Sequence, residues 1–127
     1  MSDAKAQNNT LSFTLTAPPS VNRLYRTYRG RVIKSADYRT WQQIATYEIN
    51  QQIPDNHDVW TSGAVSITLV WYRPARRGDV DNLLKASQDI FEGVVYKNDN
   101  MISESHTYRV DGDDNPRVEI TIERLVE

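Results

Sequence analysis

The segment that decides the fold is AVSITLVWYRPARRGDVDNLLKASQDIFE, residues 64–92. Residues 64–72 are rich in β-branched and aromatic side chains, which predicts a strand. Residues 81–92 carry apolar side chains at helical spacing, with Asp81 as the expected N-cap and Gly93 as the expected stop. A strand followed by a helix predicts a right-handed crossover unit if the next strand is its parallel neighbour.

The remaining elements lie on both sides of this segment. Alternating or β-rich patterns predict strands over 10–16, 105–110 and 117–124. Residues 94–104, which connect the helix to the second of these strands, are expected to form a loop. Residues 21–34 read as a basic, aromatic loop or short hairpin that turns near Arg29.

A second helix is expected between Ser35, its N-cap, and Pro54, its stop. Its buried face should consist of Tyr38, Trp41, Ile44, Ala45, Ile49 and Ile53. The order β-α-β-α-β-β then predicts an α+β fold, a mixed sheet with two main helices. Residues 1–9 are expected to be a disordered tail and residues 10–127 a single domain.

Composition excludes several kinds of site. The chain has no cysteine, so disulfides, thiolate metal sites and cysteine nucleophiles are excluded. The first residues are polar, without the apolar region of a signal peptide, and no apolar run is long enough to cross a membrane. We therefore expect a cytoplasmic protein without a membrane partner.

Charge is unevenly distributed along the chain, although the net charge is only −2. Residues 23–39 carry six basic and one acidic side chain, and residues 73–85 carry four basic and two acidic ones. These ten basic and three acidic groups give +7, against −9 for the rest. The split favours a phosphate-binding surface on an acidic body, although arginines that merely solvate two loops would produce the same pattern.

Two carboxylates, Asp79 and Asp81, stand at the expected start of the helix, and Lys85 follows within one turn. They alternate after the best strand, so both side chains point the same way if the segment is extended. A purely structural interpretation of the two acids stays open. In it Asp81 caps a helix and pairs with Lys85, while Asp79 pairs with a nearby arginine.

A third acid, Asp99, lies in a loop that we expect to fold back over the start of the helix. Three carboxylates would bind a hard divalent ion such as Mg²⁺ and leave positions for water and phosphate oxygens. Such an ion lowers the pKa of a bound water and orients it for in-line attack, and Lys85 would stabilise charge on the phosphate. The set favours phosphodiester hydrolysis.

At these residues the chain resembles the RusA-type Holliday junction resolvases, small Mg²⁺-dependent DNA endonucleases common in phages and prophages. The resemblance rests on Asp79-Val80-Asp81-Asn82-Leu83-x-Lys85, on Gly93, Tyr96 and Asp99-Asn100-Met101-Ile102, and on Pro18-Pro19-Ser20-Val21-Asn22. It covers residues from about 11 to 124, and the combined motif is far more specific than any part of it.

The resemblance implies that Asp79, Asp81 and Asp99 bind the metal, Mg²⁺ or Mn²⁺, and that Lys85 is catalytic. It implies a homodimer that nicks two strands of a four-way junction or other branched DNA, leaving 5′-phosphate and 3′-hydroxyl ends, in a bacterial or phage-infected cell. Two positions depart from the family pattern: Asn98 stands where many members have an aspartate, and Gly78 where a basic residue is common.

The expected DNA contacts come from the two basic segments: Arg23, Arg26, Arg29, Lys34, Arg73, Arg76 and Arg77. Two other functions compete with the nuclease. A non-catalytic protein that binds branched DNA would use the same basic surface. A phosphotransferase with an Asp-x-Asp-x-Thr nucleophile is disfavoured, because Leu83 replaces the hydroxyl residue.

Overall fold

The structure is a computed structural model that describes residues 9–17, 25–34, 36–74 and 80–125. Within two of these ranges, at 25–28, 32–34 and 80–82, the backbone alone is described. In chain order the elements are β1 (Thr10–Thr16), β2 (Tyr25–Tyr28), β3 (Arg31–Lys34), α1 (Ala36–Gln52), β4 (Ala64–Arg73), α2 (Val80–Phe91), the 3₁₀ turn η3 (Asp99–Met101), β5 (Ile102–Asp111) and β6 (Arg117–Leu125).

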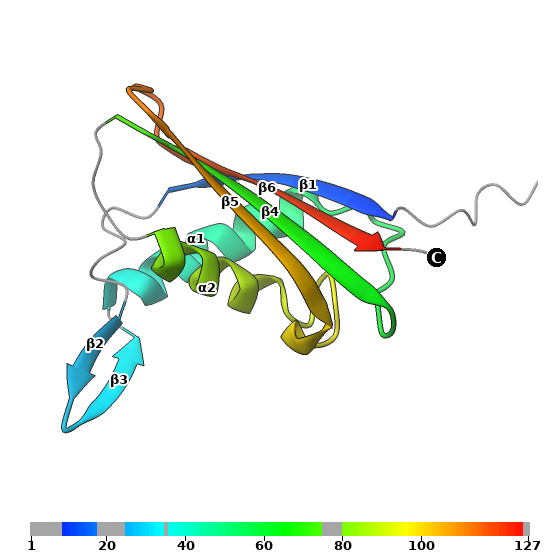
Figure 1. Ribbon diagram of the computed structural model, residues 1–127, viewed down its shortest axis with the longest axis horizontal. Helices are drawn as coiled ribbons and strands as arrows, with labels where there is room; N and C mark the ends of the chain where they lie inside the picture. Colours follow the sequence, from blue (N-terminus) through cyan, green and yellow to red (C-terminus); the bar gives the residue numbers. More distant parts are fainter. Residues whose placement is uncertain (1–8, 18–24, 35, 75–79, 126–127) are drawn as a thin grey trace, which may run out of the picture.

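The main sheet is mixed and has the strand order β1-β6-β4-β5. β4 pairs with β5 in parallel, and the β1–β6 and β4–β6 pairs are antiparallel. The condition set for a crossover unit, that the strands on either side of α2 are parallel neighbours, is therefore met. Both helices lie against one face of the sheet, while β2 and β3 form a separate hairpin that projects away from it (Figure 1).

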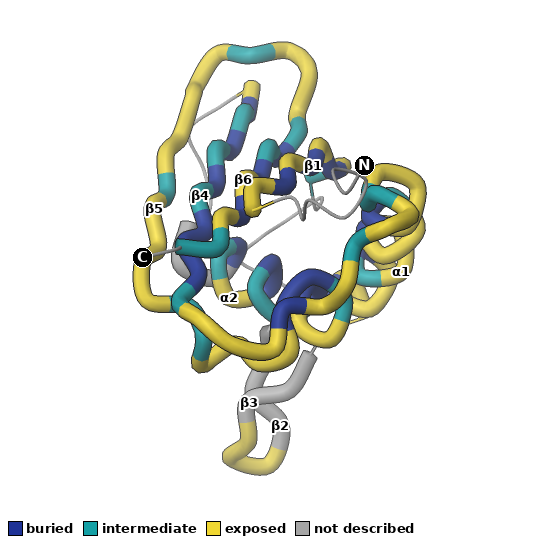
Figure 2. The backbone as a smooth tube through the Cα atoms, turned by 90° about the vertical axis from the view of Figure 1, so that its right-hand side faces the viewer, coloured by how far each residue is buried: buried dark blue, intermediate teal, exposed yellow. Residues whose placement is uncertain are grey.

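The core lies between this sheet face and the two helices (Figure 2). Alternate residues of the strands supply one side of it: Leu11, Phe13, Leu15, Val65, Ile67, Leu69, Trp71, Val118, Ile120 and Ile122. From α1 come Tyr38, Trp41, Ala45 and Ile49, and from α2 Leu83, Ala86, Ile90 and Phe91. The period of two on the strands and of 3.6 on the helices matches the patterns in the sequence.

Three local expectations were wrong. Ile44 is 43% exposed, because it lies roughly 100° around the helix from the centre of the buried stripe. Helix α2 begins at Val80, so Asp81 is inside the first turn instead of at the N-cap. The segment expected to be a loop up to residue 104 contains η3 and the start of β5, whose pairing begins with Val65 opposite Ile102.

The residue proposed as N-cap of α1, Ser35, lies outside the described residues, as do residues 1–8 of the expected tail. Among the residues that are described, no helix is long and apolar enough to cross a membrane.

Candidate active site

The start of α2 follows the carboxyl end of β4, where the sequence places its first two acids. Asp81 lies in the first helical turn, where a carboxylate interacts favourably with the helix dipole. Its side chain is not described, and Asp79 lies outside the described residues. Lys85 is exposed one turn further along the helix. Its neighbours Leu83 and Ala86 are fully buried and fix this turn against the core.

The other end of α2 holds the third acid. The helix stops before Gly93, which has a positive φ of 84° and donates its N–H to the carbonyl of Tyr96 at 2.7 Å. After this turn the Asp99 N–H donates to the Glu92 carboxylate at 2.8 Å. Asn98 caps η3, because its side-chain oxygen accepts from the N–H of Asn100 at 3.0 Å. The Asp99 carboxylate is thus carried on a braced turn and is exposed.

Tyr96 anchors this turn beneath Asp99. Its ring is buried and its hydroxyl donates to the carbonyl of Gln88 at 2.7 Å. Burial raises the pKa of the Tyr96 phenol, and the carboxylates of Asp99, Glu92 and Asp89 raise it further. The accumulation of negative charge that disfavours a phenolate here is also an environment that attracts cations.

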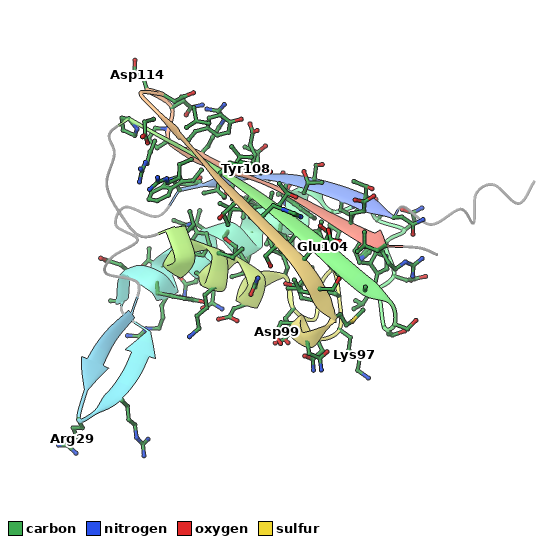
Figure 3. All side chains as sticks on the ribbon, in the orientation of Figure 1. Arg29, Lys97, Asp99, Glu104, Tyr108 and Asp114 are labelled. Atoms are coloured by element: carbon green, nitrogen blue, oxygen red, sulfur yellow. The ribbon has the colours of Figure 1, made fainter. Side chains whose placement is uncertain are left out.

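The acids at the two ends of α2 do not meet within one chain. Positions 81 and 91 are separated by about 15 Å of helix at 1.5 Å per residue. Strand register gives the same result, since β5 starts opposite Val65, whereas α2 follows the far end of β4 at Arg73. Figure 3 shows Asp99 at the end of the helix layer opposite the hairpin. The expectation that the loop of Asp99 folds back over the helix start is therefore wrong for a single chain.

The described residues contain no group of three or more Asp, Glu or His side chains placed to hold a metal ion.

Arg73 has a different role from the one expected. It is 2% exposed, its guanidinium pairs with Asp111 at the end of β5, and it lies 4.8 Å from the centre of the Trp71 ring. A buried side chain that holds two strand ends together is not available to grip a phosphate. The two following arginines, Arg76 and Arg77, lie outside the described residues.

The basic hairpin is confirmed. β2 and β3 pair from Tyr25 with Lys34 to Tyr28 with Arg31, and the turn is formed by Arg29 and Gly30, both with positive φ. Arg29 is exposed at the tip (Figure 3). The backbones of Arg26 and Lys34 lie in the two strands, their side chains are not described, and Arg23 lies outside the described residues.

The roles of two residues in this region were not predicted from the sequence. Glu92 holds the backbone of Asp99, and a weak signal for it existed: an acid just after the last turn of a helix is unfavourable for the helix dipole. Asn98 was read as a departure from a family aspartate, but its amide oxygen caps the turn that carries Asp99. Substitution of that aspartate by asparagine keeps an oxygen acceptor at the cap.

Comparison with known proteins matches this chain to the family described as endodeoxyribonuclease RusA over residues 16–123. A crossover junction endodeoxyribonuclease RusA of Aquifex aeolicus is 38% identical over 93 residues, covering 72% of this chain and 71% of the relative. Proteins of the same name from Shigella sonnei and Escherichia coli K12 are 31% and 30% identical over 119 residues, covering 92% of this chain and 97% of each relative.

The matched span includes β4, both ends of α2, η3 and β5, and therefore every described position of the candidate site. The identity extends over nearly the full length of the enteric relatives. The chain belongs to the RusA family of endodeoxyribonucleases.

Proposed function

We propose that this protein is a metal-dependent endonuclease that resolves four-way DNA junctions by paired nicks. The observation that carries the proposal is the family match from residue 16 to residue 123, which includes the acids at both ends of α2. The similar proteins are named crossover junction endodeoxyribonucleases, and that name describes a nuclease acting where strands exchange.

The proposed metal ligands are Asp79, Asp81 and Asp99, all oxygen donors of the kind that Mg²⁺ requires, with Mn²⁺ as a substitute. A bound divalent ion would supply charge stabilisation at the scissile phosphate and lower the pKa of a water molecule. Lys85, one turn after Asp81, would place a positive charge beside the phosphate as its bond to the leaving oxygen breaks. The products would be a 5′-phosphate and a 3′-hydroxyl.

The proposed site takes its acids from two chains. Asp81 and Asp99 of one chain lie at opposite ends of α2, so one ion cannot contact both. In a homodimer with two-fold symmetry, Asp99 of one copy can approach Asp81 of the other, and symmetry then produces two equal sites. Two sites per dimer are what paired nicks across a junction need.

The proposed DNA surface is the hairpin together with the loop before α2. It would use Arg23, Arg26, Arg29, Lys34, Arg76 and Arg77. The hairpin projects from the end of the molecule where α2 begins, so its strands lie at the same end as the start of that helix (Figure 1). Because phosphate contacts release counterions, affinity for branched DNA should fall steeply with salt. A protein that acts on DNA in this way would work in the cytoplasm of a bacterial or phage-infected cell.

A cleavage assay tests the proposal. The protein is incubated with Mg²⁺ and a four-way junction, a fork or a linear duplex, and both strands of each arm are labelled. We expect symmetric nicks on the junction and none on the duplex, with loss of cleavage but not of binding in Asp81→Asn. Binding without cleavage in the unmodified protein would support a non-catalytic junction-binding protein instead.

A further inference from the structure

Glu92 stands at a position that a helix disfavours for an acid. α2 ends at Phe91 and Glu92 follows at once, where the partial negative charge of the helix C-terminus repels a carboxylate. The last turn of α2 holds no basic side chain that would offset this repulsion. Glu92 is exposed and is not part of the buried core. A residue that breaks a local preference without a gain in packing points to a function outside the helix.

The contact that Glu92 makes joins the end of the helix to the acid on the following turn. The Oε2 atom of its carboxylate accepts the N–H of Asp99 at 2.8 Å, across seven positions of the chain. A charged acceptor makes such a bond stronger than a neutral one does. Asp99 is exposed and directly precedes β5 (Figure 3). Glu92 therefore ties η3 to the end of α2, where Ile90 and Phe91 are buried.

The other bonds of this turn hold the neighbours of Asp99. The side-chain oxygen of Asn98 accepts the N–H of Asn100 at 3.0 Å, and its carbonyl accepts the N–H of Met101 at 3.1 Å. In the described part of the chain, the Glu92 carboxylate is the one partner of the Asp99 N–H. Loss of Glu92 would therefore release the backbone of Asp99 while the bonds made by Asn98 persist.

The direction of the Asp99 carboxylate depends on this backbone bond. Within the described ranges no hydrogen bond reaches the carboxylate itself, so its two oxygens are directed by the backbone and by the choice of rotamer. The rotamers that a side chain can adopt depend on φ and ψ of its own residue. A fixed N–H limits φ and thereby limits the directions in which the Asp99 oxygens can point.

We propose that Glu92 is a positioning residue, which holds the backbone of Asp99 so that its carboxylate is presented to a divalent ion in a fixed direction. The proposal rests on the proposed function, in which Asp99 is a metal ligand. A ligand that is ordered before the ion binds gives a higher affinity, because less freedom is lost on binding. The active feature of Glu92 is its hydrogen-bond acceptor, since the bond it makes goes to the backbone.

Metal affinity without DNA is the first test, with Mn²⁺ as the probe and electron paramagnetic resonance to count the free ion. Glu92→Ala removes the acceptor, whereas Glu92→Gln keeps an amide oxygen that can accept the same bond. We expect Glu92→Ala to raise the Kd for Mn²⁺ by at least about ten-fold, and Glu92→Gln to stay close to the unmodified protein. Glu123→Ala and Glu123→Gln, at an exposed acid of β6, are the matched controls and should leave Kd unchanged.

Amide exchange without metal is the second test. Nuclear magnetic resonance measures how fast the Asp99 N–H exchanges its hydrogen with water. We expect this exchange to be faster in Glu92→Ala than in Glu92→Gln and the unmodified protein. The N–H of Met101, which donates to the Asn98 carbonyl, should exchange equally in all three and shows that the rest of the turn is retained.

The dependence of junction cleavage on Mg²⁺ separates positioning from a general loss of structure. We expect Glu92→Ala to lower kcat at low Mg²⁺, with KM for the junction unchanged, and rising Mg²⁺ to restore most of kcat. A protein that is merely less folded would not be rescued by the ion in this way. Circular dichroism checks folding. If Glu92→Ala does not fold, Glu92→Met, which keeps the length of the side chain without its oxygens, replaces it.

The results that overturn the proposal differ from those that overturn the function. Normal Mn²⁺ affinity in Glu92→Ala, together with lost affinity in Asp99→Asn, refutes the positioning role and leaves the metal site intact. Equal loss in Glu92→Gln and Glu92→Ala also refutes it, because the charge of Glu92 and not its acceptor would then be the active feature. An unmodified protein that neither binds Mn²⁺ nor cuts a junction refutes the proposed function itself.

Discussion

The β1 and β5 edges belong to one sheet, yet only the β1 edge has its backbone groups occupied by side chains of the described chain. The last turns of α1 bring Glu48 and Gln52 to β1, whereas α2 passes over β5 with one side-chain bond, from Gln88 to the Ser105 hydroxyl at 3.3 Å. β1 also contributes Leu11, Phe13 and Leu15 to the buried core, whereas the side chains of β5 are exposed or half-buried. The two edges therefore differ both in packing and in the cover of their backbone groups.

The same contrast separates the side chains that stabilise the sheet from those that are free for function. Arg73 and Arg109 lie on the helix side of neighbouring strands, but Arg73 is buried against Asp111 and Trp71 while Arg109 is exposed. Charge in the sequence does not distinguish them.

We expect the largest effect on DNA cleavage from removal of the Asp99 carboxylate, which lies just before the start of β5. Asp99→Asn should reduce Mg²⁺-dependent junction cleavage by at least about a hundred-fold, the magnitude typical for loss of one charge-stabilising group. Junction binding should persist, because a negative charge near phosphate has been removed. Asp58→Asn, an exposed acid outside the proposed site, is the control. Equal activity of the two variants in initial-rate assays would exclude Asp99 from the site.

Replacing the buried Arg73 should lower the free energy of unfolding more than replacing the exposed Arg109. Arg73→Met removes the ion pair with Asp111 at the joined ends of β4 and β5, and we expect a loss of about 2 kcal/mol in the free energy of unfolding. Arg109→Met on the exposed side should cost less than about 0.5 kcal/mol. Urea unfolding of both variants measures the difference, and similar midpoints would show that the burial of Arg73 carries no special stability.

Uncovering the protected edge should convert it into a second open edge. Gln52→Ala removes both hydrogen bonds to Thr14 and should cost about 1–2 kcal/mol. We also expect association beyond the dimer at high concentration, because two free backbone groups then face solvent. Gln51→Ala, exposed on the same helix, is the control. Light scattering that does not distinguish the variants would mean that the cover on β1 is unnecessary.

The last prediction concerns the turn under Asp99, where the pH-dependent part of the effect appears only in alkali. The pKa of Tyr96 is raised by burial above its ordinary value of 10.0, so above that pH the unfolded chain loses the proton while the folded one keeps it. The stabilisation is complete below pH 10.0 and declines as pH rises further. Tyr96→Phe should cost about 1 kcal/mol at pH 8 for its bond to Gln88, and should show a shallower alkaline decline. Parallel slopes between pH 9 and 11 would contradict this assignment.

Most of the fold could be predicted from local patterns. The strand over 10–16 matches β1, and the hairpin turns at Arg29. β6 ends one residue later than predicted, and α2 is shifted by one residue at both ends. These features depend on alternation, helical spacing and turn residues, which act over a few positions. The start of β5 was missed, because residues 102–104 look like loop and become a strand by pairing with β4.

The site was less predictable because it depends on contacts between distant positions. The burial of Arg73 requires Asp111, and the cap on η3 depends on the local geometry of Asn98. The position of Asp99, by contrast, could have been deduced. Parallel neighbours joined by a helix start at the same end of a sheet, so predicting the crossover already placed Asp99 away from the start of α2.

The central claim is that one active centre uses Asp81 of one chain and Asp99 of another, and mixing two inactive variants tests it directly. Asp81→Asn and Asp99→Asn proteins are combined and allowed to exchange subunits, with differently tagged chains to confirm mixed dimers. Mixed dimers then contain one doubly altered site and one intact site, so roughly a quarter of all sites are intact. We predict recovered Mg²⁺-dependent cleavage, as single nicks on the junction. Mixed dimers that form but remain inactive would contradict the account.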